Sequence, residues 1–337
     1  MTASGAPGPG SSEQGEAGSD GASPDGSDPG GSDPGGSGPG GSGLAAATAV
    51  FIEVRPQLFG IVYRMLGSAV EAEDVLQDAW IRWHTADRSV VRNPHAFLTT
   101  MTTRLAINVL HSARVRRETY IGPWLPEPVD TTHDPVLGAE RAEALDVAVL
   151  VLLERLTPTE RAAYVLREAF EYAYVDIADI VQLSQAAARQ LVSRARKHLA
   201  TGRRSTVLAD KRQALLEAFV TAARSGDLTG LERLFAEDVV SRADSGGVVR
   251  PAARVPVVGR RKVARLLRAY APTFWPDVAV RPLHVNGHAA VGLARRGELF
   301  CVLSVTASEQ GVHELLWQMN PVKLAQVRCG GPEPGLS

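Results

Sequence analysis

The sequence predicts a multidomain protein in which two small all-helical domains are followed by an α+β domain. Its 337 residues are many for a single compact core, which favours two or three domains. Between residues 51 and 199, apolar residues recur at three- and four-residue spacing, as in amphipathic helices. After residue 211, short apolar runs are separated by Asn-Gly and Arg-Gly pairs, a pattern typical of strands joined by tight turns.

Segment 1–43 is predicted to be disordered, because its Gly-Ser-Asp-Pro-Gly and Gly-Ser-Gly-Pro-Gly units cannot bury enough apolar surface to offset the entropy of ordering. The segment holds six acidic residues and no Lys or Arg, whereas the whole chain has a formal net charge of -1. The remaining residues therefore carry about +5. We interpret this tail as a solubilising appendage, with a specific binding role as the alternative. The other predicted divisions are a helical domain over 44–120, a linker over 121–138, a second helical domain over 139–204, an α+β domain over 205–327 and a tail over 328–337.

The first helical domain is predicted to contain three helices, each with one apolar stripe. The stripes are Phe51, Val54, Leu58, Ile61, Val62 and Met65, then Ala72, Val75, Leu76, Ala79 and Trp83, then Phe97, Leu98, Met101, Leu105 and Val109. Asn93-Pro94 is expected to break the second helix. The proline-rich stretch 122–128 ends the domain, since each proline lacks an amide donor and restricts the residue before it.

The second helical domain contains a predicted helix-turn-helix. Thr157-Pro158-Thr159-Glu160 has the pattern of a helix start, with Thr157 as the cap, proline at the first helical position and Glu160 completing a capping box. Two short helices follow, over 174–181 and 184–199, with a tight turn around Gln182 and Leu183.

The second of these helices suits a DNA major groove. Ser184 is placed to cap it, and its apolar stripe consists of Ala188, Leu191, Val192, Ala195 and Leu199. The rest of its surface is polar and basic, and Arg and Gln make bidentate contacts to base edges. A solvated basic helix is the alternative. The preceding short helix and the capped start favour DNA binding.

The predicted second helix of the first domain carries a polar stripe opposite its apolar one. The stripe consists of Asp74, Gln77, Asp78 and Arg82. By residue type alone, a solvated helix face is the preferred interpretation. Acid-base or metal chemistry is disfavoured, because no histidine or third carboxylate accompanies the stripe at ligand spacing.

The α+β domain is predicted to open with helix through Leu215, Leu216, Phe219 and Leu231 to Phe235 and to end in an antiparallel meander. Turns are expected at Asn286-Gly287 and Arg296-Gly297, and strands over 302–306 and 315–319. Its titratable groups form no catalytic spacing motif: His284, His288, His313, Asp244 and Asp277. Cys301 and Cys329 lack metal-ligand spacing and are expected to be free thiols.

Several segments resemble the sigma-70 family of RNA polymerase sigma factors. Residues 71–82 (EAEDVLQDAWIR) resemble region 2.2, residues 93–117 resemble regions 2.3 and 2.4, and residues 157–199 resemble region 4. The absence of regions 1.1 and 3 is similar to the extracytoplasmic-function group. Within that group, the segments 120–128 (YIGPWLPEP) and 188–196 (ARQLVSRAR) resemble the SigJ-like subgroup, whose members carry a fused SnoaL-like α+β cone domain.

This resemblance implies core RNA polymerase, through its β′ clamp and β flap, and promoter DNA as partners. The implied polymerase-binding residues are Asp74, Gln77, Asp78 and Arg82. The implied contacts to the −10 element are Arg104, Asn108, His111, Arg114, Arg116 and Arg117. The implied contacts to the −35 element are Gln185, Arg189, Gln190, Ser193, Arg194 and Lys197. Asn108 stands where many relatives have Asp.

The resemblance also implies that the fused domain controls the helical core, in place of a separate anti-sigma factor. The implied regulatory residues are Trp124, Leu125, Pro126, Asp244, Gly246, Gly247, Asn320, Pro321 and Lys323. Two motifs differ from the subgroup. Asp-Gly-Gly-Gly-Lys is replaced by Asp244-Ser245-Gly246-Gly247-Val248, and Asn-Pro-Asp-Lys-Leu by Asn320-Pro321-Val322-Lys323-Leu324.

A cytoplasmic protein is expected, because no run of eighteen apolar residues and no export signal occur. The resemblance to sigma factors implies that the protein is associated with the nucleoid. No metal or cofactor is expected. Two alternatives stay open. One is a helix-turn-helix regulator that does not bind polymerase, and the other is a fused domain that binds or isomerises a small molecule.

Overall fold

The computed structural model describes residues 39–118, 120–131, 147–200, 207–249, 252–325 and 327. Residues from Gly43 onward form one unit by their contacts. The predicted tails and the second half of the predicted linker lie mostly outside the described residues, as does Cys329. The first helix nevertheless begins at Pro39, inside the segment that we predicted to be disordered.

The first helical domain has the three predicted helices and one additional short turn. They are α1 (Pro39–Leu66), α2 (Ala69–Thr85), the 3₁₀ turn η1 (Arg88–Val90) and α3 (Pro94–Glu118). The apolar stripes of the first two helices are buried as predicted. The second helix ends at Thr85, well before Asn93-Pro94, because Asp87 caps the 3₁₀ turn that follows it. Asn93 instead accepts a hydrogen bond from the Ala96 amide at the start of α3.

The predicted stripe of α3 is shifted. Leu98 is fully buried, but Phe97 is exposed, and Met101, Leu105 and Val109 are only half-buried. The buried face consists of Leu98, Thr99, Thr102, Thr103, Ala106, Leu110 and Ala113. Helix α3 is contacted by α2 and also by α6 and α7 of the second domain, so its covered surface is wider than a single stripe.

Helix α1 is apolar enough over Leu44–Leu66 to cross a membrane by length and composition. The same residues supply Phe51, Val54 and Leu58 to the helical core. Buried core helices of this kind pass such a test without entering a membrane.

The second helical domain is built from α5 (Val147–Leu153), α6 (Pro158–Glu168), α7 (Tyr174–Val181) and α8 (Gln185–Ala200). The capping box of Thr157 and Glu160 is present. Ser184 accepts a hydrogen bond from the Ala187 amide, and Gln182 adopts the left-handed conformation in the turn. The predicted helix-turn-helix is therefore confirmed. One hydrophobic core runs through both helical domains, from Ala47 to Leu199.

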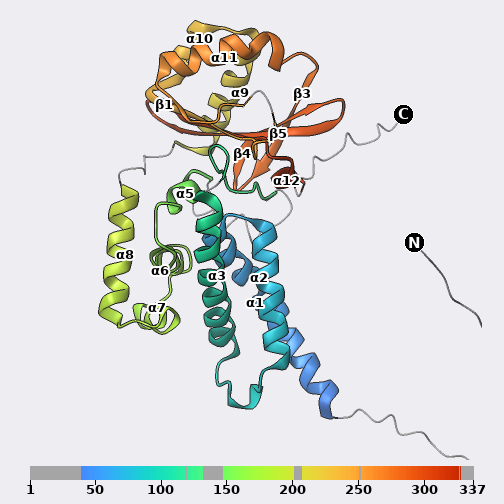
Figure 1. The fold of residues 1–337 in the computed structure, drawn as a ribbon, viewed down its shortest axis with the longest axis vertical. Helices are drawn as coiled ribbons and strands as arrows, with labels where there is room; N and C mark the ends of the chain where they lie inside the picture. Colours follow the sequence, from blue (N-terminus) through green and yellow to red (C-terminus); the bar gives the residue numbers. More distant parts are fainter. Residues whose placement is uncertain are drawn as a thin grey trace, which may run out of the picture. The chain divides into compact units, whose positions relative to one another are not determined.

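The C-terminal domain places three helices against one face of a six-stranded sheet (Figure 1). Its helices are α9 (Ala209–Ser225), α10 (Leu228–Leu234), α11 (Arg260–Phe274) and α12 (Pro321–Leu324). Its strands are β1 (Phe235–Asp244), β2 (Val257–Val258), β3 (Val278–Val285), β4 (His288–Arg295), β5 (Glu298–Ser308) and β6 (Gly311–Gln318). Helices α9, α10 and α11 cover the sheet, and the strand order is β2-β1-β6-β5-β4-β3.

The predicted meander is confirmed from β3 to β6, with tight turns at Asn286-Gly287 and Arg296-Gly297 that have positive φ at all four residues. The predicted opening helix is present as two helices, α9 and α10, and α10 ends at Leu234, one residue earlier than predicted. The strand β1, which begins at Phe235, was not predicted. Strand β1 pairs in parallel with β6, and a register shift between Phe235 and Val240 interrupts its alternation. That irregularity removes the period-two pattern by which a strand is recognised in a sequence.

Candidate functional site

The linker from Tyr120 to Thr131 contacts both the first helical domain and the C-terminal domain. Leu125 is buried and packs with Leu316 of β6 and with Val147 and Val151 of α5. Further along, Thr131 donates its amide proton to the His284 carbonyl, and Asp130 forms a bridge to Val285. The linker thereby pairs with β3, an edge strand that would otherwise expose unpaired backbone groups.

The centre of the site is the fully buried carboxylate of Asp244, at the end of β1. One oxygen accepts the Leu125 amide proton at 2.9 Å and the Lys323 ammonium at 2.7 Å. The other accepts the Tyr120 hydroxyl at 2.5 Å and the Gly246 amide at 3.1 Å. Two donors from the linker, one from the loop after β1 and one from α12 therefore satisfy one buried charge.

The Lys323 side chain is the cation of this pair and is 8% exposed. Its ammonium also donates to the Leu125 carbonyl at 2.6 Å. It lies 4.3 Å from the Trp124 ring centroid and 5.1 Å from that of Tyr120. Both distances are within the range of a cation–π contact.

Tyr120 extends the network to the loop before α12. Burial raises the pKa of the Tyr120 phenol, and its hydrogen bond to Asp244 raises that pKa further. The phenol therefore stays protonated near neutral pH and donates to the carboxylate. Its oxygen accepts a proton from the Asn320 amide group at 2.8 Å, and Asn320 also caps α12.

The glycines predicted as regulatory lie beside this network. A Cβ on Gly246 would be 2.7 Å from the Asn320 amide nitrogen, and one on Gly247 would be 3.1 Å from the Ile121 side chain. Pro321 occupies the first turn of α12. The structure thus gathers the predicted regulatory residues in one place, including Trp124, Leu125 and Lys323, although the subgroup's motifs are altered.

Glu127 connects the linker to α2, the helix that carries the polar stripe. Its carboxylate accepts from the Ser68 hydroxyl at 2.7 Å and from the amides of Ala69 and Val70 at 2.6 and 3.2 Å. Its own amide donates to the Gly67 carbonyl at 2.8 Å. A carboxylate at this position satisfies the first amides of a helix and the positive end of its dipole.

A second bridge joins the two domains through Tyr63 and Asn286. The Tyr63 hydroxyl donates to the Glu127 carbonyl at 2.6 Å and accepts from the Asn286 amide group at 2.6 Å. Asn286 also exchanges hydrogen bonds with the backbone of Val129. Burial raises the pKa of Tyr63, so this link is also made by a neutral phenol.

Gly67 leaves room for the Trp124 ring. Gly67 has a φ of +66°, and a Cβ there would lie 2.6 Å from the ring. We expect Gly67→Ala to lower the free energy of unfolding by about 1–3 kcal/mol and to displace Trp124. Urea unfolding and limited proteolysis of the linker measure the two effects. The matched control is Gly297→Ala, where φ is +86° and a Cβ meets nothing within 4 Å. A linker equally protected in both variants would contradict the prediction.

All four residues of the predicted polymerase-binding stripe are exposed on α2: Asp74, Gln77, Asp78 and Arg82. Beside the stripe, α1 and α2 form a shallow hollow lined by Ile52, Trp80 and other side chains. Glu73 at its edge pairs with Arg55 at 2.5 Å. The stripe is therefore free to contact another molecule.

The predicted −10 contacts do not share one environment. Asn108 and His111 are exposed on α3. Arg104 instead donates to the carbonyls of Ile180 and Asp179, at 2.9 and 2.7 Å, at the end of α7. The side chains of Arg114, Arg116 and Arg117 lie outside the described residues.

All six predicted −35 contacts are exposed on α8: Gln185, Arg189, Gln190, Ser193, Arg194 and Lys197. The Arg189 guanidinium lies 5.5 Å from the Tyr174 ring centroid. Arg194 is 3.7 Å from Glu160 but remains 60% exposed. Arg196 is different, because it donates to Glu168 at 2.7 Å, and this hydrogen bond raises its pKa.

The two helical domains are joined by contacts that the sequence did not indicate. The buried Arg161 donates to the Met65 carbonyl at 2.7 Å and pairs with Glu154 at 2.6 Å. The Tyr172 hydroxyl contacts Gln57 and Thr99. With Arg104, these contacts hold the helix-turn-helix against α1 and α3.

The titratable groups considered for catalysis do not converge. Asp277 is exposed in a turn, and the carbonyl of His284 is bonded to the linker. His313 contacts the Ser308 hydroxyl at 2.6 Å and lies 3.4 Å from Asp238. This resembles a nucleophile relay, but Ser308 is buried in its own hairpin and accepts the Gln310 amide. Among the described residues, no group of three or more His, Cys, Asp or Glu could hold a metal ion.

The fold and the site define a two-module helical DNA-binding protein whose linker is held by a fused α+β domain. The Sigma-70 region 2 model matches residues 50–117, and the Sigma-70 region 4 model matches residues 146–199. The ECF RNA polymerase sigma factor SigJ of Mycobacterium tuberculosis is 39% identical over 234 residues, which are 68% of this chain and 74% of that protein. The chain belongs to the extracytoplasmic-function (ECF) RNA polymerase sigma factors.

Two further comparisons agree. The probable ECF sigma factor SigI of Mycobacterium tuberculosis is 30% identical over 213 residues, which are 60% of this chain and 71% of that protein. The crystal structure of Mycobacterium tuberculosis SigJ superposes with a TM-score of 0.66 at 32% identity, covering 83% of this chain and 98% of that chain. The expected fold class is confirmed in its architecture: two all-helical sigma domains are followed by a C-terminal α+β domain.

Sequence reasoning missed several residues that hold the linker: Tyr63, Ser68, Glu127, Asn286 and Gln318. The Gln318 amide group donates to the carbonyls of Leu125 and Pro126 at 3.4 and 3.0 Å. Of these residues, only Glu127 could have been identified from the sequence, because it lies inside the linker motif 120–128. The others lie far from the linker in sequence, and only the packing of α1, α2 and the sheet places them beside it.

Proposed function

We propose that the chain directs core RNA polymerase to promoters through surfaces on α2, α3 and α8, and that the fused domain controls them through the linker. The observation that supports this control is that hydrogen bonds of Asp244 and Glu127 connect the linker to the fused domain and to α2. Asp244 of the fused domain binds Leu125, and two residues later Glu127 caps α2. A change in the hydrogen bond between Asp244 and Leu125 would therefore be transmitted to α2, the helix that carries the polymerase-binding stripe.

In this proposal, α2 binds the polymerase clamp through Asp74, Gln77, Asp78 and Arg82, and α8 enters the major groove of the −35 element. The exposure of these side chains supports both assignments. Each module binds weakly by itself, and polymerase supplies the spacing that makes the two additive. Cytoplasmic, nucleoid-associated localisation follows from this role.

The state described here is proposed to be the resting one. Arg104 is occupied by the carbonyls at the end of α7, so it cannot bind DNA without separation of the two helical modules. We propose that binding to polymerase separates them. The fused domain would then replace an anti-sigma factor by favouring the closed arrangement, and it would perform no chemistry of its own.

Association with purified core polymerase tests the α2 surface. We expect the double variant Asp74→Ala/Asp78→Ala to bind core enzyme roughly tenfold or more weakly, because truncating a hot-spot residue of an interface costs about 2 kcal/mol or more. Fluorescence anisotropy of the labelled full chain measures the affinity. The control is Asp176→Ala, an exposed acid in the first turn of α7.

Equal affinity of the double variant and the wild type would remove the α2 stripe from the interface. Failure of the wild type to bind core enzyme would favour the alternative, a helix-turn-helix regulator that acts without polymerase.

A further inference from the structure

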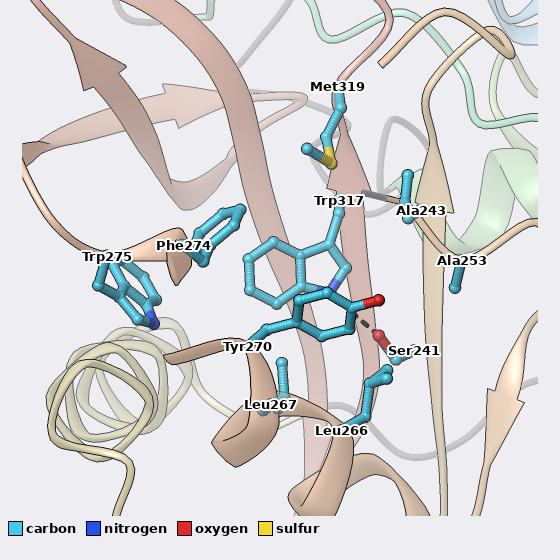
Figure 2. Close-up of a pocket in the computed structure, with 11 residues that line it drawn as sticks. Ser241, Ala243, Ala253, Leu266, Leu267, Tyr270, Phe274, Trp275, Trp317 and Met319 are labelled. Atoms are coloured by element: carbon cyan, nitrogen blue, oxygen red, sulfur yellow. Dashed lines mark hydrogen bonds between the residues drawn. The ribbon is translucent and has the colours of Figure 1, made fainter. Parts of the chain in front are cut away.

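The C-terminal domain contains an open apolar pocket between its sheet and α11 (Figure 2). Eleven residues line it: Ser241, Ala243, Ala252, Ala253, Leu266, Leu267, Tyr270, Phe274, Trp275, Trp317 and Met319. None of these eleven side chains is charged. Such a lining suits a neutral molecule, because a buried ion would lack a counter-charge.

The aromatic side chains of the pocket are held at fixed angles. The Phe274 ring lies edge-on to Trp275 and Trp317, with centroids 5.1 and 5.8 Å apart. Trp275 and Trp317 are buried, whereas Tyr270 is 39% exposed at the side of the pocket. Rings fixed in this way present flat apolar surfaces, which favour a planar ring compound over a flexible chain.

One buried polar group faces the pocket. The Ser241 hydroxyl accepts the Trp317 indole proton at 3.1 Å and is 6% exposed (Figure 2). Because its oxygen already accepts, its own proton is available to a ligand oxygen. The pocket therefore combines apolar walls with a buried hydroxyl that can orient a ligand, beside the more exposed Tyr270 hydroxyl.

The pocket and the linker site lie on opposite faces of the same two strands. In the parallel register of β1 and β6, Ala243 is opposite Trp317 and Asp244 is opposite Gln318. Ala243 and Trp317 line the pocket, whereas the next residues, Asp244 and Gln318, bind the linker. This is the alternation of a pleated strand.

At the ends of β1 and β6, neighbouring residues again contact the pocket and the linker in turn. Met319 lines the pocket, and its amide donates to the Asp244 carbonyl at 2.7 Å. The next residue, Asn320, binds Tyr120. A ligand that pushes Met319 or Trp317 must therefore shift the backbone that carries Asp244, Gln318 and Asn320.

We propose that this pocket binds a small, neutral, planar ring compound with a hydrogen-bonding group. We further propose that a bound ligand changes, through β1 and β6, the hydrogen bonds that Asp244, Gln318 and Asn320 make to the linker. Any effect of the ligand on transcription rests on the proposed function. Ligand binding and the change in the linker can be tested independently of that function.

The test uses the full chain without polymerase or DNA, with 2-naphthol as the probe and naphthalene-2-sulfonate as the charged counterpart. We expect saturable binding of 2-naphthol with a dissociation constant on the order of 10⁻⁴ M, by calorimetry, and at least tenfold weaker binding of the sulfonate. Amide hydrogen exchange at Leu125 and Glu127 is expected to change when 2-naphthol is bound.

Two variants at one position locate the binding site. Ala253→Phe fills the pocket from a loop and should weaken binding at least tenfold, whereas Ala253→Ser leaves the space and should bind like the wild type. Absence of saturable binding, or equal binding by Ala253→Phe, would overturn the site. Binding that Ala253→Phe abolishes but that leaves linker exchange unchanged would overturn the coupling. Neither result depends on polymerase, so each is distinguishable from failure of the proposed function.

Discussion

The substitution Asp244→Asn is expected to lower the free energy of unfolding by roughly 3–5 kcal/mol and to release the linker. The exchange keeps the shape of the side chain but removes the charge that faces the buried Lys323 ammonium at 2.7 Å. Burying a charge without its counter-ion is far more costly than losing one hydrogen bond. Urea unfolding of the full chain, with hydrogen exchange at the Leu125 amide, measures both consequences.

Two controls separate charge loss from other effects. Asp210→Asn removes an exposed acid from α9 and should leave both measurements unchanged. The double variant Asp244→Asn/Lys323→Met removes the stranded cation as well, so it should regain part of the stability lost by Asp244→Asn. If Asp244→Asn unfolds at the wild-type urea concentration and its linker is equally protected, the ion pair does not hold the linker.

Arg189→Ala is expected to lower transcription from the cognate promoter by a factor that corresponds to about 1–3 kcal/mol, the range for one base-specific contact. Arg189 is exposed on α8, and its guanidinium lies over the Tyr174 ring, with no ion pair to any residue that the structure describes. Multiple-round transcription in vitro with core polymerase and promoters altered at the −35 element measures the loss and its sequence dependence.

The matched control is Arg196→Ala on the same helix. Because Arg196 is engaged by Glu168 at 2.7 Å, its loss should not relax −35 selectivity. If −35 selectivity is unchanged in Arg189→Ala, Arg189 does not contact bases. If both variants lose transcription uniformly across promoters, their arginines contribute through general charge, as phosphate contacts do.

Most of the local structure could be predicted from residues that are close together in the chain. The stripes of α1 and α2, the capping box at Thr157, the turn at Gln182 and the hairpin turns at Asn286-Gly287 and Arg296-Gly297 were all predictable. Each depends on side chains a few residues apart, so the sequence contains the whole interaction. The family resemblance likewise rests on contiguous segments.

The contacts that hold the linker join residues that are far apart in the sequence. Asp244 and Lys323 are 79 residues apart, and Tyr63 and Asn286 are 223 apart. The proximity of Asp244 and Lys323 depends on the parallel pairing of β1 with β6, which cannot be recognised from the irregular pattern of β1. The proximity of Tyr63 and Asn286 depends on the position of the β3–β4 turn beside the linker. The wider burial of α3 and the engagement of Arg104 by α7 also require a second domain packed alongside. A residue's neighbours in sequence do not specify contacts of this kind, because they arise from the register and docking of whole elements.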